Sequence, residues 1–217
     1  MSSLTEENYL KAIYRISQDG SSKITPTSIA DALKVNAASV VDMIKKLAEK
    51  KMISYDKSKG VKLSEKGMKS ALSIIRNHRL WEVFLLEKLG YSWDVVHEIA
   101  EQLEHIKHPE LANRLDEYLG YPEYDPHGDP IPKPSGEMPD TYRTMLSEIE
   151  VGKTCRVAAV KDTSVLFLQY LLQLSVKIGT KIKVLNKIPF DGLMTIQIGK
   201  DARTTVSKKF ADNLLVD

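Results

Sequence analysis

Proline is concentrated in one stretch of the chain, and this stretch separates two differently patterned parts. Residues 121–140 contain six of the nine prolines in the 217-residue sequence. Because proline lacks a backbone N–H and has a fixed φ, such a stretch forms neither a regular helix nor a central strand. We expect a linker or a loop fastened to the rest of the protein. The pattern predicts three domains, which cover residues 1–68, 69–140 and 141–217.

The first domain has the pattern of short helices followed by a hairpin. Capping residues and apolar residues at helical spacing predict helices over 4–17, 27–33 and 36–50. The last two are joined by a short turn, as in a helix-turn-helix. Residues 52–55 and 61–63 flank a glycine-containing tip and predict a β-hairpin. A helical hairpin beside an unrelated β-hairpin is the simpler alternative, but the complete order favours a DNA-binding winged helix.

In a winged helix, the start of the second helix of the helix-turn-helix and the tip of the hairpin lie nearest to DNA. Small side chains at this helix start let its N-terminus approach a DNA backbone closely. The residues expected at the recognition helix are Asn36, Ala37, Ala38, Ser39, Asp42 and Met43. The residues expected to contact phosphates are Thr27, Lys46, Lys57 and Lys59.

One predicted helix of the second domain carries carboxylates and imidazoles on a single face. Residues 92–107 begin with a capping serine and end before a proline. At about 100° per residue, four of its side chains share an arc of about 100°, with apolar residues on the opposite face. These four are His97, Glu101, Glu104 and His105. The preceding predicted helix, residues 64–89, adds His78 and Glu82 one turn apart.

These six side chains offer nitrogen and oxygen donors, which suit Mn²⁺, Fe²⁺, Co²⁺ or Zn²⁺ and disfavour Cu⁺. The chain has one cysteine, so we expect neither a disulfide nor a zinc–thiolate site within it. A solvated face with pairs four residues apart is the alternative, but the number of donors favours one or two divalent-metal sites. His108 is expected to be exposed, and His127 either fastens the proline-rich loop or reaches a metal.

The last third of the chain has the pattern of a small β module. Alternating residues predict strands over 156–160, 181–185, 194–198 and 204–207, with a short helix over 167–174. The expected fold class is therefore mainly α with a small β-barrel at the C-terminal end. The sequence does not indicate whether this module binds a partner, tethers to the helical core or supplies metal ligands.

The order of these motifs resembles the iron- and manganese-dependent repressors of the diphtheria toxin repressor and manganese transport regulator type. The resemblance is carried by the winged helix, His78, the spacing His97-x3-Glu101-x2-Glu104-His105 and the Pro-His-Gly-Asp-Pro-Ile-Pro segment at 126–132. It covers nearly the whole chain. It implies an N-terminal winged helix, a helical metal-binding and dimerisation domain, and a C-terminal SH3-like (FeoA-like) domain.

The resemblance also implies two metal sites. The primary site corresponds to Asn8, Glu101, Glu104 and His105, and the ancillary site to His78, Glu82 and His97. Further candidate ligands are Asp125, His127 and Asp162. Asn8 stands where manganese-type members have aspartate and iron-type members have methionine. Glu101 stands where iron-type members have cysteine, and this loss of a soft ligand tilts the preference towards Mn²⁺.

The implied function is that of a metal-dependent transcriptional repressor rather than an enzyme. It would bind double-stranded operator DNA as a homodimer when loaded with Mn(II) or Fe(II), at one or two positions per subunit, and would control metal-uptake genes. We expect a cytoplasmic protein with no small-molecule substrate and no membrane span, since no run approaches about 18 apolar residues. The alternatives are a winged-helix regulator that responds to a non-metal effector and a helical-bundle metalloenzyme, which needs Glu-x-x-His pairs on two helices.

The dimer contact is expected on the apolar face of residues 92–107, with Leu111, Leu115 and Leu119 beyond it. The alternative is that these leucines only complete the core of one subunit.

Overall fold

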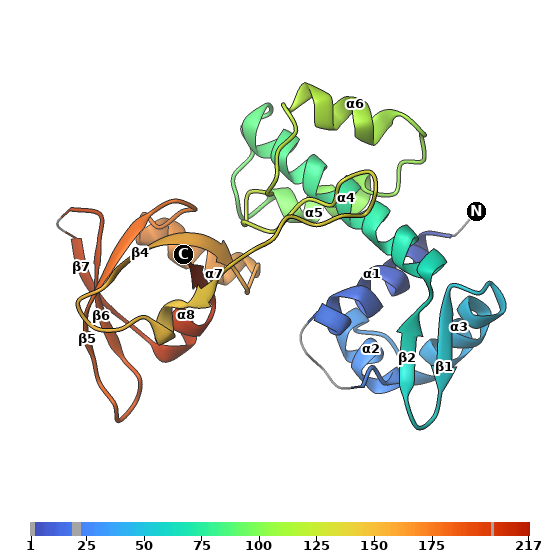
Figure 1. Cartoon of the computed structure of the whole chain (residues 1–217), viewed down its shortest axis with the longest axis horizontal. Helices are drawn as coiled ribbons and strands as arrows, with labels where there is room; N and C mark the ends of the chain where they lie inside the picture. Colours follow the sequence, from blue (N-terminus) through green and yellow to red (C-terminus); the bar gives the residue numbers. More distant parts are fainter. Residues whose placement is uncertain (1–2, 19–22, 201) are drawn as a thin grey trace. The chain divides into compact units, whose positions relative to one another are not determined.

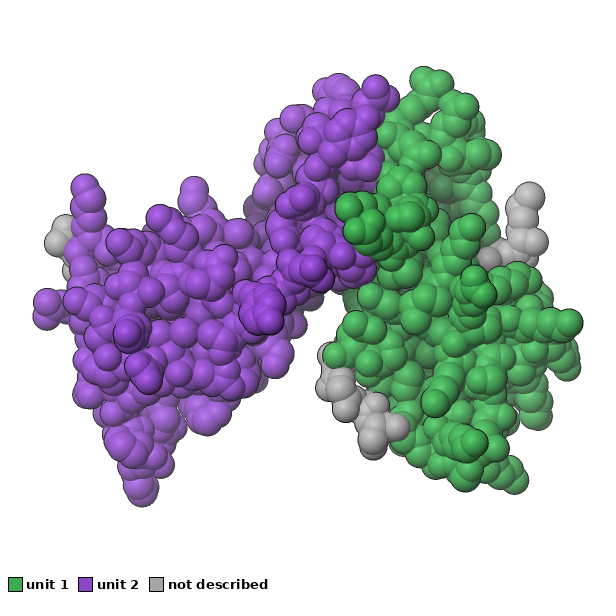
Figure 2. Space-filling view, in the orientation of Figure 1, with its two compact units in different colours: residues 1–78, 101–114, 132–137 green, residues 79–100, 115–131, 138–217 purple. Residues whose placement is uncertain are grey.

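The computed structural model describes residues 3–18, 23–200 and 202–217, which form two compact units (Figure 2). Each unit has its own apolar core. The first unit takes the described residues within 1–78, 101–114 and 132–137, and the second those within 79–100, 115–131 and 138–217. This division runs through the helical domain expected at 69–140, so the three predicted domain boundaries stay a prediction. In the described residues, no helix is both long enough and apolar enough to cross a membrane.

The first unit begins with three helices, α1 (Leu4–Gln18), α2 (Pro26–Leu33) and α3 (Ala37–Glu49) (Figure 1). The Thr25 side chain accepts a hydrogen bond from the Ser28 backbone N–H, and the Ser28 hydroxyl accepts one from the Thr25 N–H. This reciprocal cap satisfies N–H groups at the start of α2. Asn36 Oδ1 accepts the Ala38 N–H at 2.8 Å and so caps α3.

A two-stranded hairpin follows, formed by β1 (Ile53–Asp56) and β2 (Gly60–Leu63). The carboxylate of Asp56 accepts the backbone N–H groups of Ser58 and Lys59 and thereby shapes the tip. Gly60 has φ +81, and a Cβ there would lie 2.4 Å from the Ile24 carbonyl oxygen. The hairpin therefore packs against the helices as a wing, and the predicted winged helix is confirmed.

The core of the first unit joins all of these elements. It is formed by apolar residues on one face of each helix together with residues of the wing, including Tyr9, Leu10, Ile13, Ile29, Val40, Ile44, Leu47, Ile53 and Val61. Because α1 places several fully buried residues in this core, α1 is part of the winged-helix body rather than an appendage.

Three further helices follow, α4 (Glu65–Glu87), α5 (Val96–Leu103) and α6 (Leu111–Tyr118). The helix expected over 92–107 is thus shorter than predicted at both ends. The Ser92 hydroxyl donates to Asp94 instead of capping, and two consecutive N–H groups, of Val95 and Val96, converge on the Ser92 carbonyl. These contacts form a tight turn ahead of α5, while Glu104 and His105 lie just beyond its last residue.

The second unit contains a six-stranded antiparallel sheet in the order β3-β8-β4-β5-β6-β7 (Figure 1). Its strands are β3 (Thr144–Met145), β4 (Thr154–Val160), β5 (Lys181–Lys187), β6 (Met194–Ile198), β7 (Ala202–Val206) and β8 (Leu214–Val216). A 3₁₀ helix (Leu146–Glu148), α7 (Val165–Gln173) and α8 (Lys208–Asp212) accompany the sheet. The expected mainly α fold with a C-terminal β module is confirmed, although β3, α8 and β8 were not predicted.

The proline-rich loop is fastened to this sheet. Val160 of β4 donates its backbone N–H to the His127 carbonyl at 3.0 Å. Gly128 has φ +87, and a Cβ there would come within 2.1 Å of the Ala158 carbonyl oxygen. The loop also closes on itself through a bridge between Tyr124 and Pro130. Between residues 121 and 131 the segment is therefore an ordered loop of the second unit rather than a free linker.

Glu6 links α1 to α3 and makes part of the stability of the first unit depend on pH. Its buried carboxylate lies 2.7 Å from Lys50 Nζ and 3.0 Å from Lys46 Nζ. Burial acts to raise the pKa of Glu6, but hydrogen bonds from these lysines and from the Ser3 N–H outweigh burial and lower it to about 2. Since the ordinary pKa is 4.5, this contribution to stability is complete above that value and is lost as pH falls towards 2.

We therefore expect Glu6→Gln to reduce the free energy of unfolding by about 1.5–3 kcal/mol at neutral pH, the range for hydrogen bonds to a charged group. Urea unfolding of both proteins would measure this difference. The difference should shrink as pH is lowered from about 5 to about 3, because Glu6 of the unfolded chain takes up a proton in this interval while Glu6 of the folded protein stays ionised. A difference that stays constant over this interval would contradict the assignment.

Candidate metal centres and nucleic-acid interface

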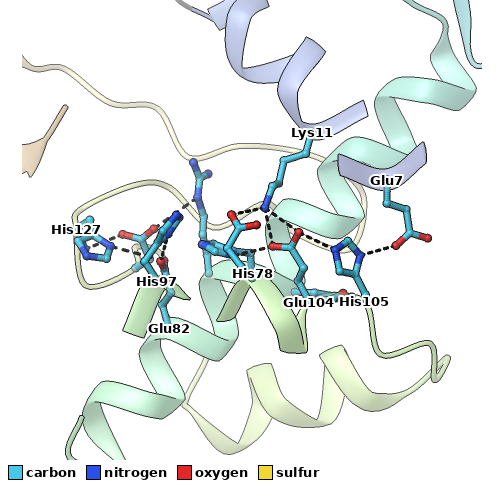
Figure 3. A network of polar contacts seen from close by, with 12 residues as sticks. Glu7, Lys11, His78, Glu82, His97, Glu104, His105 and His127 are labelled. Atoms are coloured by element: carbon cyan, nitrogen blue, oxygen red, sulfur yellow. Dashed lines mark hydrogen bonds and ion pairs between the residues drawn. The ribbon is translucent and has the colours of Figure 1, made fainter. Parts of the chain in front are cut away.

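Three buried side chains of the second unit place ligand atoms close together. Glu82 belongs to α4, while Asp125 and His127 belong to the proline-rich loop, and one ligand atom of each lies within 4.8 Å of the other two. His127 Nδ1 is 3.6 Å from Glu82 Oε2, and His97 Nδ1 of α5 is 3.0 Å from Glu82 Oε1 (Figure 3). We call Glu82, His97, Asp125 and His127 the second-unit cluster.

The surroundings of His127 determine which ring nitrogen can act as a ligand. His127 Nε2 lies 3.3 Å from the backbone carbonyl of Trp93. A carbonyl oxygen only accepts hydrogen bonds, so Nε2 carries the proton in this contact. The other nitrogen, Nδ1, faces Glu82 and keeps its lone pair when the ring is neutral. A backbone carbonyl that orients the imidazole in this way is the usual support of a metal-bound histidine.

Asp125 concentrates negative charge in the same place. Its Oδ1 accepts the backbone N–H groups of His127 and Asp129, which hold the loop around it. Burial, the nearby Glu82 carboxylate and Asp129 raise the pKa of Asp125 to about 8, against the opposing effect of Arg79 and His127. Burial acts to lower the pKa of His127, but the contact with Glu82, the charge of Asp125 and the Trp93 carbonyl together outweigh burial and raise it. Both shifts show that the carboxyl groups of Glu82, Asp125 and Asp129 crowd together here, and a bound cation would relieve their mutual repulsion.

The donor set of the second-unit cluster fits a divalent metal. It combines carboxylate oxygens with imidazole nitrogens and has no thiolate, which suits Mn²⁺, Fe²⁺ or Zn²⁺. Glu82, Asp125 and His127 are almost completely buried, whereas the His97 side chain is 29 % exposed and marks the solvent side of the group. Buried ligands on a rigid helix and on a strapped loop are the arrangement that a specific ion site requires.

A second polar group lies in the first unit, around Lys11, a residue that no sequence motif had indicated. Lys11 Nζ of α1 is 2.7 Å from Glu101 Oε1, and it is 2.7 and 2.8 Å from the two carboxylate oxygens of Glu104 (Figure 3). The Glu104 side chain is completely buried, and its Oε2 also lies 2.6 Å from His78 Nδ1. The group comprises Glu7, Lys11, His78, Glu101, Glu104 and His105, which we call the first-unit cluster.

Glu7 of α1 completes this cluster. Its two carboxylate oxygens lie 2.7 Å from His105 Nδ1 and 2.7 Å from Lys107 Nζ. Glu7 and Lys11 are one helical turn apart, so both face the segment 101–107. Their spacing next to Asn8 was visible in the sequence, but nothing local showed that they point towards Glu104 and His105.

The structure brings together some, but not all, of the predicted metal ligands. Glu82 and His97 meet as expected, and Asp125 and His127 join them, whereas Glu101, Glu104 and His105 gather around Lys11 and Glu7. Asn8 is half-buried, and its Oδ1 has no hydrogen-bond partner among the described residues. The carboxylate of Asp162 accepts the Ser164 N–H ahead of α7, and His108 is exposed as predicted. The ligand roles of all these residues stay predictions.

The predicted DNA-contacting residues form an exposed surface at the start of α3 and at the wing tip. Their exposed members are Thr27, Asn36, Ala37, Ala38, Ser39, Asp42, Lys46, Lys57 and Lys59. Met43 instead is half-buried and packs against the core of the first unit, and Lys46 also pairs with Glu6. The capped N-terminus of α3 is therefore free to approach a phosphate backbone.

The residues expected at a dimer contact differ in exposure. Leu115 is buried within its own subunit, so it serves the core of the monomer, whereas Leu111 and Leu119 are half-buried. Ile106, from the predicted apolar face, is 45 % exposed. The dimer contact itself stays a prediction.

Comparison with protein families covers almost the whole chain. The model described as "Iron dependent repressor, N-terminal DNA binding domain" matches residues 1–61. The model described as "Iron dependent repressor, metal binding and dimerisation domain" matches residues 64–133. A third, the FeoA domain, matches residues 144–217.

Individual proteins agree with these matches. The iron-dependent repressor IdeR of Mycobacterium tuberculosis is 31 % identical over 162 residues, covering 70 % of this chain and 69 % of the relative. A solved manganese-dependent transcriptional repressor in complex with manganese is 32 % identical, with a TM-score of 0.88 over 97 % of this chain and 98 % of the other. The manganese regulator SloR is 34 % identical, with a TM-score of 0.79 over 98 % and 97 % of the two chains.

Proposed function

This chain belongs to the iron-dependent repressor family, and from that premise we propose that it is a transcriptional repressor whose binding to operator DNA depends on a divalent metal ion. The observation that carries the proposal is the second-unit cluster, a buried set of carboxylate and imidazole donors in a chain that also has an exposed recognition helix. The same family membership favours a regulatory role over a catalytic one. A protein that acts on operator DNA would work in the cytoplasm.

The metal would be held by Glu82, Asp125 and His127, with His97 at the solvent side. Mn²⁺ or Fe²⁺ bound there would supply positive charge between carboxylates that otherwise repel each other. The residues themselves come from α4, α5 and the proline-rich loop, so they define one arrangement of these three elements. A ligand shifts a conformational equilibrium only by its different affinity for the two states. A ten- to hundredfold change in DNA affinity requires a coupling of about 1.4–2.7 kcal/mol.

DNA recognition would follow the geometry of other helix-turn-helix proteins. The start of α3 would enter the major groove, with Asn36, Ser39 and Asp42 next to the base edges, and Asp42 is suited to accept from a cytosine amine. Lys57 and Lys59 at the wing tip would contact phosphates. A homodimer would read two half-sites that are about 34 Å apart. Sedimentation of the protein with Mn²⁺ and with chelator would test the dimer.

The proposal is tested by titrating the protein onto labelled promoter DNA of metal-uptake genes and following fluorescence anisotropy. We expect binding with Mn²⁺ or Fe²⁺ to be at least tenfold tighter than with a chelator, because the second-unit cluster is complete only with a cation. Zn²⁺ would serve as the comparison ion. Binding that is tight and insensitive to chelation would instead favour a winged-helix regulator that responds to a non-metal effector.

A further inference from the structure

We propose that the Lys11 ammonium is the resident cation of the first-unit cluster, so that Glu101 and Glu104 hold a lysine rather than a metal ion. The chain would then bind one divalent ion per subunit, at the second-unit cluster. This count rests on the proposed function, whereas the role assigned to Lys11 does not.

The contacts of Lys11 are those of a charge that is fully satisfied by its surroundings. Its ammonium group has three N–H donors, and three carboxylate oxygens lie within 2.8 Å of it, one from Glu101 and two from Glu104. The Lys11 side chain is 6 % exposed and that of Glu104 is not exposed at all. A buried charge pair is favourable only when geometry and hydrogen bonding are this complete.

A metal ion would need the same oxygens. Divalent metal ions lie about 2.0–2.2 Å from the carboxylate oxygens that bind them. An ion bound to Glu101 and Glu104 would therefore need the space that Lys11 Nζ occupies. A divalent ion bound to these oxygens would lie next to the Lys11 ammonium, and at that range the two positive charges repel each other. Lys11 would have to leave a buried position, and the contacts of Glu104 with His78 Nδ1 at 2.6 Å and with His105 Nε2 at 3.4 Å would change as well.

The two clusters differ in the positively charged groups that lie next to their carboxylates. In the first-unit cluster the carboxylates of Glu7, Glu101 and Glu104 face two permanent cations, because Lys107 pairs with Glu7 as Lys11 pairs with the others. In the second-unit cluster Glu82 and Asp125 are grouped with imidazoles, which coordinate metal as neutral donors, and the guanidinium of Arg79 lies 3.6 Å from Asp125, farther than the lysines lie from the first-unit carboxylates. The carboxylates of the first-unit cluster therefore already have lysine ammonium groups within 2.7 Å, whereas those of the second-unit cluster lie beside imidazole nitrogens that can share a metal ion with them.

If Lys11 is the resident cation, α1 is held in place without a metal ion. Lys11 and Glu7 connect α1, a part of the winged-helix core, to residues 101–107 within the first unit. These contacts are made by side chains alone and persist when metal is removed. The metal response would then arise from the elements that carry the second-unit cluster.

The test is the number of Mn²⁺ ions bound per subunit, measured on the full-length protein by equilibrium dialysis and elemental analysis. We expect one ion in the native protein, one in Glu104→Gln and none in Glu82→Gln. Lys11→Gln should bind one ion more than the native protein, because Glu101 and Glu104 lose their cation. Lys11→Arg, which keeps the charge, is the matched control and should match the native count.

Two ions in the native protein, one of which is lost in Glu104→Gln, would overturn the proposal, and so would a Lys11→Gln protein with an unchanged count. A second measurement covers the case in which Lys11→Gln does not fold. An amine-acylating reagent, followed by peptide mass analysis, should leave Lys11 of the native protein unmodified both with and without Mn²⁺. Increased labelling of Lys11 upon addition of Mn²⁺ would show that a metal displaces it, which also overturns the proposal.

A different pattern of Mn²⁺ counts would contradict the proposed function. If the native protein binds no Mn²⁺ while Lys11→Gln binds one ion, the metal-dependent repressor proposal is wrong at the second-unit cluster, but the role of Lys11 is supported. The two conclusions are therefore separable in one set of measurements.

Discussion

Glu82→Gln is expected to remove the metal response of DNA binding. Glu82 lies at the centre of the second-unit cluster, with His97 and His127 on its two carboxylate oxygens and Asp125 within the same group of ligand atoms. The substitution keeps the size of the side chain but removes the charge that a divalent ion requires. The ten- to hundredfold stronger binding expected with Mn²⁺ should therefore fall to no more than about twofold, measured by anisotropy on the same promoter DNA.

Glu87→Gln is the matched control for this experiment. Glu87 is the last residue of the same helix, its side chain is 51 % exposed, and it pairs only loosely with Lys88 at 3.6 Å. Its loss should leave the metal response unchanged, because exposed pairs of this kind contribute little. Circular dichroism would establish that both variants are folded. A folded Glu82→Gln protein with the full native response to Mn²⁺ would show that the second-unit cluster is not the metal centre.

Lys11→Met is expected to destabilise the protein strongly when metal is absent. The substitution leaves the buried carboxylate of Glu104, together with Glu101, without the ammonium that lies 2.7 Å from each. Removal of one partner from a buried ion pair typically costs about 3–5 kcal/mol, because the other charge stays buried without compensation. Urea unfolding in the presence of a chelator would measure the loss in the free energy of unfolding.

A double-mutant cycle makes the result specific to this pair. Glu104→Gln in the Lys11→Met background should recover part of the stability, because the uncompensated buried charge is then removed. Lys45→Met is the control, since Lys45 and its partner Asp42 are both largely exposed and their pair contributes about 0–1 kcal/mol. Strictly additive losses for Lys11→Met and Glu104→Gln would contradict a direct ion pair.

The local elements of the chain could be predicted from its sequence because they depend on neighbouring residues. Capping side chains such as Thr25 and Asn36 satisfy N–H groups two or three positions away, and apolar spacing marks the buried face of each helix. The wing and the longer strands of the sheet could be predicted from the sequence for the same reason. The exact ends of α5 were not, because a tight turn at Ser92 replaced the expected helical start.

The composition of the two clusters was decided by tertiary structure. The sequence by itself determined which side chains share a helical face, and so it identified Glu82, His97, Glu101 and Glu104 as members of polar sites. It did not determine their partners, since Lys11 and Glu104 are 93 positions apart and His105 and Glu7 are 98 apart. Which cation faces a carboxylate depends on the packing and register of whole helices, and that packing is set by the cores rather than by the polar residues themselves.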